Sequence, residues 1–456
     1  MSLESLLQQK GGAVKLLRNS PIGPYVYPVV SPEYTNWRDE QRSWQKTCVL
    51  FNQSYHMSDM YVKGPDALKL LSALGINTFK NFGANKAKQF VACNYDGYVI
   101  GDVILFGLGD DTYNLVGRPS IHNWVQYHCE TGGYNAKCTR DERAAAQKGP
   151  IVRQTYRYQV QGPNAQQLME KALGGPVPEV KFFQMDTFTI AGKKVSALRH
   201  GMVGQPGYEL FGPAADGEIV KDALVEAGKD LGLRLSGSRA YSSNTLESGW
   251  IPSPLPAIYT GEKMKAFREW LGDDAYEGIG SLGGSFYSEN IEDYYFTPYD
   301  LGYGGMVKFD HDFIGREALE KIAQASKRTK VTLALNEEDV MKNVIGTIFD
   351  KGERAKFMEF PSAVYSTWPY DKVTKNGKTI GVSTWVGYSS NEGKMLTLAI
   401  LDNEFAHPGE QVTFVWGQQP GSGERPTVES HKQVEIRAIV SPVPYAEVAR
   451  DNYRNT

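Results

Sequence analysis

The last third of the chain is a series of short strand-like runs separated by turns, and this series constrains the fold more than any other feature. The runs begin near Val331, and two of the turns are signalled by Asn376-Gly377 and Pro408-Gly409. Consecutive short strands of this kind are typical of a small all-β barrel. We therefore predict a C-terminal β-barrel domain, 327–456, after a boundary in the polar stretch 324–329.

The first two thirds of the chain mix strands with helices, which predicts an α+β fold. One hairpin is expected from 99–105 to 113–116, and its second strand leads to Arg118. Another hairpin is expected around a turn at Gly192, and apolar residues at helical spacing cover 219–227.

The size and charge of the chain limit the function classes. With 456 residues, it can form two or three domains of ordinary size. Its 49 Lys and Arg residues against 52 Asp and Glu residues give a net charge of −3, without a basic block that would follow a phosphate backbone. We therefore expect no nucleic-acid partner. No run approaches the roughly 20 apolar residues of a membrane helix, so we expect a soluble cytoplasmic protein without a membrane partner.

Two sequence patterns resemble motifs for other cofactors. In both, the neighbouring residues that such a motif requires are absent. The four cysteines, which include Cys129 and Cys138, are not accompanied by a CxxC pair or an HExxH helix, so we expect reduced thiols and no metal site. Residues 278–283 match the dinucleotide pattern GxGxxG, yet no apolar strand precedes them. We interpret this segment as a glycine-rich surface or active-site loop.

Separated segments of the chain carry a resemblance to a known family. They are YQVQGP at 158–163, HGMVGQPGYEL at 200–210, and LGYG at 301–304 followed by DFIGREAL at 312–319. In order and spacing they resemble the glycine-cleavage T-protein (aminomethyltransferase) family, whose members hold tetrahydrofolate to accept one carbon. The resemblance implies tetrahydrofolate as the cofactor and a T-protein-like folate-binding fold, with two interwoven α/β subdomains in 1–326.

The expected cofactor contacts lie on these segments. Glu209 is in an apolar, glycine-flanked stretch where a buried carboxylate needs hydrogen-bond donors, and the resemblance assigns pterin binding to it. Gln159 and Gln161 would point to one strand face and bind pterin edges, unless the turn after them pulls one aside. Trp250 either stacks on the cofactor or fills the core. Glu247 either binds the pterin or lies on a helix surface.

Two departures from the T-protein pattern are informative. The first residue of the family's double aspartate is Gly101 here, and the family's arginine before the Leu-Glu-x-Gly segment aligns with Tyr241. Aminomethyl-lipoyl protein is therefore not the expected substrate. With the segments 25–28, 53–57 and 249–256, these departures resemble the tetrahydrofolate-dependent aryl O-demethylases, which act on vanillate and 3-O-methylgallate, and a related group that acts on methoxybenzoate herbicides such as dicamba.

This resemblance implies transfer of a methyl group from a methoxybenzoate-type acid to N5 of tetrahydrofolate. The leaving phenoxide is basic, so a donor to its oxygen assists the reaction, and Tyr241, with a reference pKa of about 10, is our candidate unless it is a core tyrosine. We expect Arg118 to bind the substrate carboxylate, unless it forms a surface ion pair. His56 and Tyr27 are expected to contact ring substituents or relay a proton, and Gln53 is a further substrate contact.

Two other functions stay open on the same fold. One is an amine or sulfonium demethylase, for which a cation such as Arg118 in the pocket is unfavourable. The other is a folate-binding protein without methyl transfer. The sequence does not indicate which methoxyarene is accepted.

Overall fold

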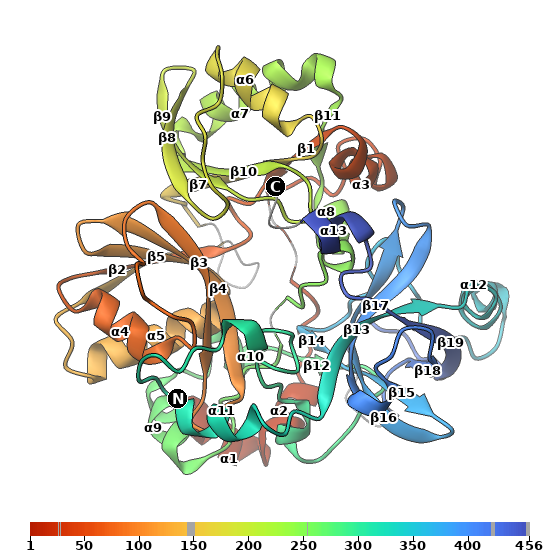
Figure 1. Cartoon of the computed structure of the whole chain (residues 1–456). Helices are drawn as coiled ribbons and strands as arrows, with labels where there is room; N and C mark the ends of the chain where they lie inside the picture. The colour runs from red at the N-terminus through yellow and green to blue at the C-terminus, as the bar shows by residue number, and fades with distance from the viewer. Residues whose placement is uncertain (26, 28, 144–150, 253, 421–424, 453–456) are drawn as a thin grey trace.

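Three lobes surround a common centre in this protein. The computed structural model describes residues 1–456 except 26, 28, 144–150, 253, 421–424 and 453–456. Val26, Pro28 and Ser253, from the segments quoted above, therefore lie outside the described residues. Figure 1 shows a six-stranded sheet at the top, a five-stranded sheet at the left and a closed barrel at the right.

The six-stranded sheet has the strand order β11-β1-β7-β10-β9-β8. Its strands are β1 (Cys48–Asn52), β7 (Thr155–Gln161), β8 (Met185–Ile190), β9 (Lys193–Arg199), β10 (Gly207–Pro213) and β11 (Leu233–Ser236). Helices α6 (Ala165–Leu173) and α7 (Gly217–Gly228) cover one face, on which Val160 and Leu210 are buried. Residues alternate between faces along each strand, so the neighbours of Val160 and Leu210, which include polar side chains, lie on the opposite face.

The five-stranded sheet has the order β3-β4-β5-β2-β6. Its strands are β2 (Ser58–Lys63), β3 (Lys86–Cys93), β4 (Val99–Gly109), β5 (Thr112–Gly117) and β6 (Lys137–Asp141). Helices α4 (Ala67–Leu74) and α5 (Pro119–Thr131) pack against it. The pairings β4–β5 and β8–β9 confirm both predicted hairpins. Arg118 follows β5 directly and takes the N-cap position of α5, whose first residue is proline.

The chain path interweaves the two sheets. β1 belongs to the six-stranded sheet, β2 to β6 build the five-stranded sheet, and β7 then returns to pair antiparallel with β1. The N-terminal helices α1 (Leu3–Lys10) and α2 (Ala13–Arg18) share a core with side chains from 255–319. The predicted α+β fold with interwoven subdomains is confirmed.

The predicted C-terminal barrel is also confirmed. Its strands close in the order β13-β17-β16-β15-β18-β19, and β19 pairs with β13. They are β13 (Arg328–Leu335), β15 (Asp371–Lys375), β16 (Lys378–Ser389), β17 (Lys394–Asp402), β18 (Gln411–Trp416) and β19 (Val434–Ser441). Asn376 and Gly377, at φ 50° and 76°, form the tight β15–β16 turn, as their types predict. The domain division at 326/327 stays a proposal, since barrel residues Leu398 and Ile400 belong to the core that α1 shares.

The remaining helices and two short strands lie between these sheets or at their edges. They are α3 (Trp37–Lys46), α8 (Ser238–Ser248), α9 (Lys265–Trp270), α10 (Tyr276–Ile279), α11 (Arg316–Ile322), α12 (Glu337–Asp339), α13 (Glu447–Asn452), β12 (Leu282–Gly283) and β14 (Trp368–Pro369). Within the described ranges, no helix has the length and apolar character needed to cross a bilayer.

Candidate active site

Three predicted site residues from distant parts of the chain form one aromatic cluster. Tyr27 precedes α3, His56 follows β1, and Tyr241 lies on α8. The Tyr27 and His56 rings stack with centroids 4.7 Å apart, and the His56 and Tyr241 rings meet edge to face at 4.8 Å. Tyr27 and Tyr241 are 5.6 Å apart, and Phe51 packs its ring edge against Tyr241 at 5.2 Å. These contacts fix the orientation of the Tyr241 ring.

The Tyr241 hydroxyl has a defined hydrogen-bond partner. Gln53 Nε2 donates to Tyr241 Oη at 3.1 Å, so the oxygen accepts this bond and its own proton remains available to a third group. Burial raises the pKa of Tyr241 well above its usual range. The hydroxyl is therefore protonated at neutral pH. Gln53, predicted as a substrate contact, therefore contacts the Tyr241 hydroxyl directly.

His56 cannot act as an acid at neutral pH. Burial, together with the nearby Arg118 and Arg143 guanidinium groups, holds the pKa of His56 well below its ordinary value of 6.5. Its Nδ1 atom is buried and has no hydrogen-bond partner among the described residues. A neutral imidazole can still donate or accept one hydrogen bond to a ring substituent, which leaves the proton-donor role to Tyr241.

This state of His56 gives a pH prediction. Because the folded pKa is depressed well below 6.5, the imidazole is already neutral at pH 6.5 and gains a proton only at lower pH. We expect kcat/KM for a methoxybenzoate to show no ionisation near pH 6.5. Initial rates in overlapping buffers between pH 5.5 and 8 test this. A tenfold change per pH unit that begins near 6.5 and disappears in His56→Gln would contradict it.

The polar face of the six-stranded sheet carries the predicted pterin contacts. Gln159 on β7 lies directly opposite Glu209 on β10, and Gln161 lies opposite Gly207. Cross-strand partners point to the same face, so the three polar side chains share it, as the alternation predicted. The residue opposite Gln159 on the other neighbouring strand is Phe51, which contacts Tyr241. The two groups of predicted residues therefore adjoin.

Glu209 is buried but not isolated. Its side chain accepts a hydrogen bond from Arg157, whose other amino group donates to Asp59 at 2.7 Å. Burial raises the pKa of Glu209, and the Arg157 charge opposes that rise. In the described part of the chain, Oε2 has no hydrogen-bond partner. Sequence reasoning missed Arg157, although it lies two positions before Gln159 and therefore on the same face of β7.

Both glutamines keep one unused polar atom. Gln159 Nε2 donates to the His200 carbonyl at 2.7 Å, and Gln161 Oε1 accepts from the Met202 backbone N–H at 2.8 Å. Gln159 Oε1 and Gln161 Nε2 are buried and have no partner within the described ranges. Buried polar atoms without partners are uncommon and costly, so these two atoms, on the face that carries Glu209, are candidates for contacts to a polar ligand.

Trp250 does not fill the core. Its side chain is 40% exposed, and its indole Nε1 donates to Asp102 Oδ2 at 2.9 Å. Asp102 also accepts from Gln89 at 2.6 Å.

Gly101 stands where the T-protein pattern has its first aspartate. A Cβ atom added to Gly101 would lie 3.2 Å from side-chain atoms of Ser120 and Ile121 in α5. Helix α5 thus occupies the space that a first aspartate would need.

Both interpretations of Glu247 are wrong. The residue is fully buried, and it joins α8 to α3 and to the end of β16. It accepts hydrogen bonds from Trp44 Nε1 at 2.7 Å, Ser389 Oγ at 2.6 Å and Asn391 Nδ2 at 3.0 Å. Its carboxylate is thereby committed to the protein and holds the helix that carries Tyr241.

We expect Glu247→Ala to lower the free energy of unfolding by about 3 kcal/mol or more, because several buried donors lose their acceptor. Glu392→Ala is the matched control. Glu392 is a partly exposed carboxylate next to Asn391, in the turn between β16 and β17, and its loss should cost less than about 0.5 kcal/mol. Urea unfolding of both variants measures the difference. Equal midpoints would contradict the structural role of Glu247.

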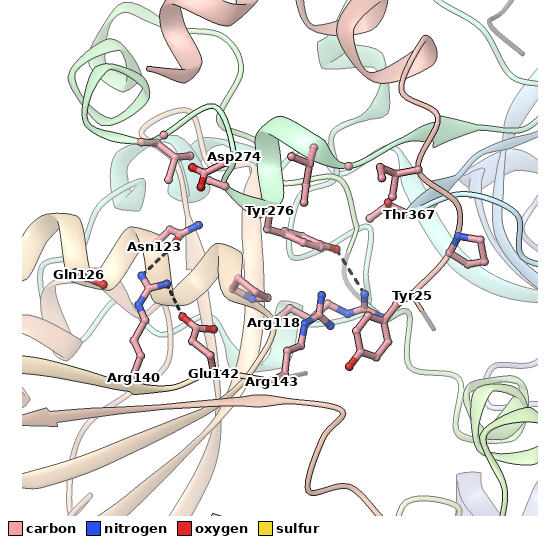
Figure 2. Close-up of a pocket in the computed structure, with 18 of the residues that line it drawn as sticks. Tyr25, Arg118, Asn123, Gln126, Arg140, Glu142, Arg143, Asp274, Tyr276 and Thr367 are labelled. Carbon is pink, nitrogen blue, oxygen red and sulfur yellow. Dashed lines mark hydrogen bonds and ion pairs between the residues drawn. The ribbon is translucent and has the colours of Figure 1, made fainter. Parts of the chain in front are cut away.

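Arg118 separates two cavities. A cavity of about 460 Å³ and one of about 200 Å³ are both lined by Arg118, Tyr25 and Thr367. Tyr27 lines the smaller cavity, and Gly280, between α10 and β12, lines the larger. The segment 278–283 is thus a largely buried helix end and short strand, and the predicted surface loop is wrong. Figure 2 shows Arg118 beside Tyr25, with Tyr276 Oη 3.5 Å from its Nη1 atom. The surface-salt-bridge interpretation of Arg118 is wrong, since no carboxylate of the described residues pairs with it.

The comparison with known proteins decides the family. The model of the GCVT N-terminal domain matches residues 18–253. The chain belongs to the GCVT family. This membership confirms the predicted relation to the glycine-cleavage T-proteins. The GCVT-family protein is 56% identical, over 455 residues, to a syringate O-demethylase from Sphingobium sp., and the match covers 100% of this chain and 98% of the relative.

Further matches extend the picture of this GCVT-family chain. It is 30% identical to a sesamin methylene transferase from Sinomonas sp., over 87% of this chain and 85% of that relative. Its fold is similar to the glycine cleavage system aminomethyltransferase T from Bartonella henselae, with a TM-score of 0.59 and 18% identity. That match covers 93% of this chain and 92% of the solved chain, so the three-lobed fold is common to the two proteins.

Proposed function

We propose that this protein is a tetrahydrofolate-dependent O-demethylase that removes a methyl group from a methoxybenzoate-type acid of the syringate class. One observation carries the proposal: a partly buried, protonated Tyr241 hydroxyl lies in an aromatic cluster that adjoins Arg118, an arginine that no carboxylate of the described residues pairs with. The products would be a phenol and 5-methyltetrahydrofolate. The whole-length likeness to a syringate O-demethylase supports the substrate class.

The polar face of the six-stranded sheet fits tetrahydrofolate. A pterin ring offers adjacent N–H donors and ring acceptors. Glu209 supplies a carboxylate oxygen without a partner, Gln159 Oε1 is a second acceptor, and Gln161 Nε2 is a donor. Exposed Trp250 offers a flat surface for stacking. When bound, the cofactor supplies N5 as the atom that accepts the methyl group.

The residues of this chain would act on the departing oxygen and on the ring. Tyr241 would donate its hydrogen bond to the phenolic oxygen as the O–CH₃ bond breaks, which stabilises the developing negative charge. Gln53 holds the tyrosine oxygen in place. Arg118 would bind the carboxylate at the other end of the ring, and Tyr27 and His56 would contact the ring substituents. Positioning of the two reactants provides a further part of the rate.

An amine or sulfonium demethylase is the less favoured function. A cationic substrate prefers acidic or purely aromatic walls. Here Arg118 and Arg143 lie in the wall of the larger cavity, and their charges disfavour a cation. A folate-binding protein without catalysis would leave the hydrogen-bonded Tyr241–Gln53 pair without a chemical role.

A direct assay tests the proposed function. Purified protein is incubated anaerobically with tetrahydrofolate and a panel that contains syringate, vanillate, 3-O-methylgallate and dicamba, with a sulfonium compound and a methylated amine as alternatives. We expect 5-methyltetrahydrofolate and the phenol product to appear in equal amounts. Tetrahydrofolate binding without loss of any methoxy group would support the non-catalytic function instead.

A further inference from the structure

Two arginines, the partly buried Arg118 and the buried Arg143, face the larger cavity, and neither pairs with a carboxylate of the described residues. Figure 2 shows the Arg118 and Arg143 side chains next to each other beside Tyr25. The guanidinium of Arg143 lies 4.1 Å from the centre of the Tyr25 ring and 5.6 Å from that of Tyr276. Arg143 is only 8% exposed, and its Nη1 atom is buried without a hydrogen-bond partner in the described part of the chain. The backbone N–H of Arg143 is held by Ser58 Oγ at 2.9 Å.

Other arginines nearby, the partly buried Arg140 and the buried Arg157, are paired. Arg140, in the same cavity, contacts Glu142 at 3.3 Å and donates to Asn123 Oδ1 at 2.9 Å. Arg157 is paired with two carboxylates. A buried cation without an anion is costly, and a second cation beside it adds repulsion. The Arg118–Arg143 pair is therefore a prepared site for an anion.

The pair is connected to the proposed reaction centre by ring contacts. The Tyr25 ring lies against Arg143, and its centroid is 6.0 Å from that of the His56 ring. The centroids of the His56 and Tyr241 rings are 4.8 Å apart. The Tyr25 hydroxyl donates to the Tyr55 carbonyl at 2.7 Å, which fixes that ring. A methoxybenzoate carries its carboxylate at one end of the ring and a methoxy group toward the other. One such molecule can therefore place its carboxylate at the two arginines and its methoxy oxygen at the Tyr241 hydroxyl.

We propose that Arg143 is a second carboxylate-binding residue, and that it and Arg118 bind the substrate carboxylate together. This inference rests on the proposed function and deepens it. Stacking on Tyr25 and Tyr276 would orient the Arg143 guanidinium, and the carboxylate would supply the missing acceptor for both cations. The pair then selects aromatic acids over the corresponding uncharged amides, esters and aldehydes.

Calorimetric binding tests this without turnover. Syringate and syringamide, which have the same shape but differ in charge, are titrated into the full-length protein without folate at pH 7. The wild type should prefer the acid. Arg143→Met should lower syringate affinity by about tenfold to a hundredfold, because a charge-assisted hydrogen bond is lost, and should leave syringamide affinity nearly unchanged. Arg143→Lys should restore part of the preference.

Arg140→Met is the matched control, because this arginine lines the same cavity but already has a carboxylate partner. It should keep the wild-type ratio of acid to amide affinity. Thermal melting shows which variants are folded, and Arg143→Lys serves if Arg143→Met is not. A folded Arg143 variant with the wild-type ratio overturns the role of Arg143 alone. A wild type that binds no methoxybenzoate overturns the proposed function as well.

Discussion

Replacing Tyr241 with phenylalanine should lower kcat for a methoxybenzoate by about 10²- to 10⁴-fold, the range expected when a general acid is lost. The reason is that only its hydroxyl, held by Gln53, is proposed to stabilise the departing phenoxide. Tetrahydrofolate affinity should change little, since the proposed pterin contacts lie on the six-stranded sheet. Single-turnover rates and folate titrations on one preparation separate these two quantities.

The size of the Tyr241→Phe effect should depend on the leaving group. Substrates with electron-withdrawing ring substituents release a less basic phenoxide, so they should lose less rate. Tyr156→Phe is the matched control, because it removes a tyrosine hydroxyl that is buried on the other side of the sheet, and it should leave kcat unchanged. Equal losses of kcat and folate affinity, or a loss independent of the leaving group, would contradict the proposed role.

Glu209→Gln should weaken tetrahydrofolate binding by about tenfold to a hundredfold, because a charge-assisted hydrogen bond to the pterin is replaced by a neutral one. The amide keeps the size of the side chain, and Arg157 retains Asp59 as a partner. Anaerobic calorimetry with tetrahydrofolate measures the change.

The control for Glu209→Gln is Glu247→Gln. Glu247 is another buried carboxylate, but its partners are structural, so its replacement should lower stability without a specific loss of folate affinity. Wild-type folate affinity in a folded Glu209→Gln protein would remove Glu209 from the site. Comparable folate losses in both variants would indicate an indirect effect of destabilisation.

Local patterns in the sequence were sufficient for the two hairpins and the C-terminal barrel. The turn at Asn376-Gly377 and the strand-like runs after Val331 predicted the barrel, because a tight turn and strand alternation depend on neighbouring residues. Alternation along β7 likewise placed Gln159 and Gln161 on one face, and the register with β10 agrees. Family membership followed from the order of several motifs, which needs no knowledge of contacts.

Long-range contacts decided what the sequence left open. Glu247 looked like a surface or pterin carboxylate, yet its donors Trp44 and Ser389 come from residues 203 and 142 positions away. The same holds for Arg143, which acquires its place beside Arg118 only when β6 and β5 join one sheet. Sequence alone determined the two hairpins, the barrel and the family of this protein, because these depend on local patterns and on the order of motifs along the chain. Only the tertiary structure decided which charges are paired and which are left for a ligand, because pairing depends on distance in space.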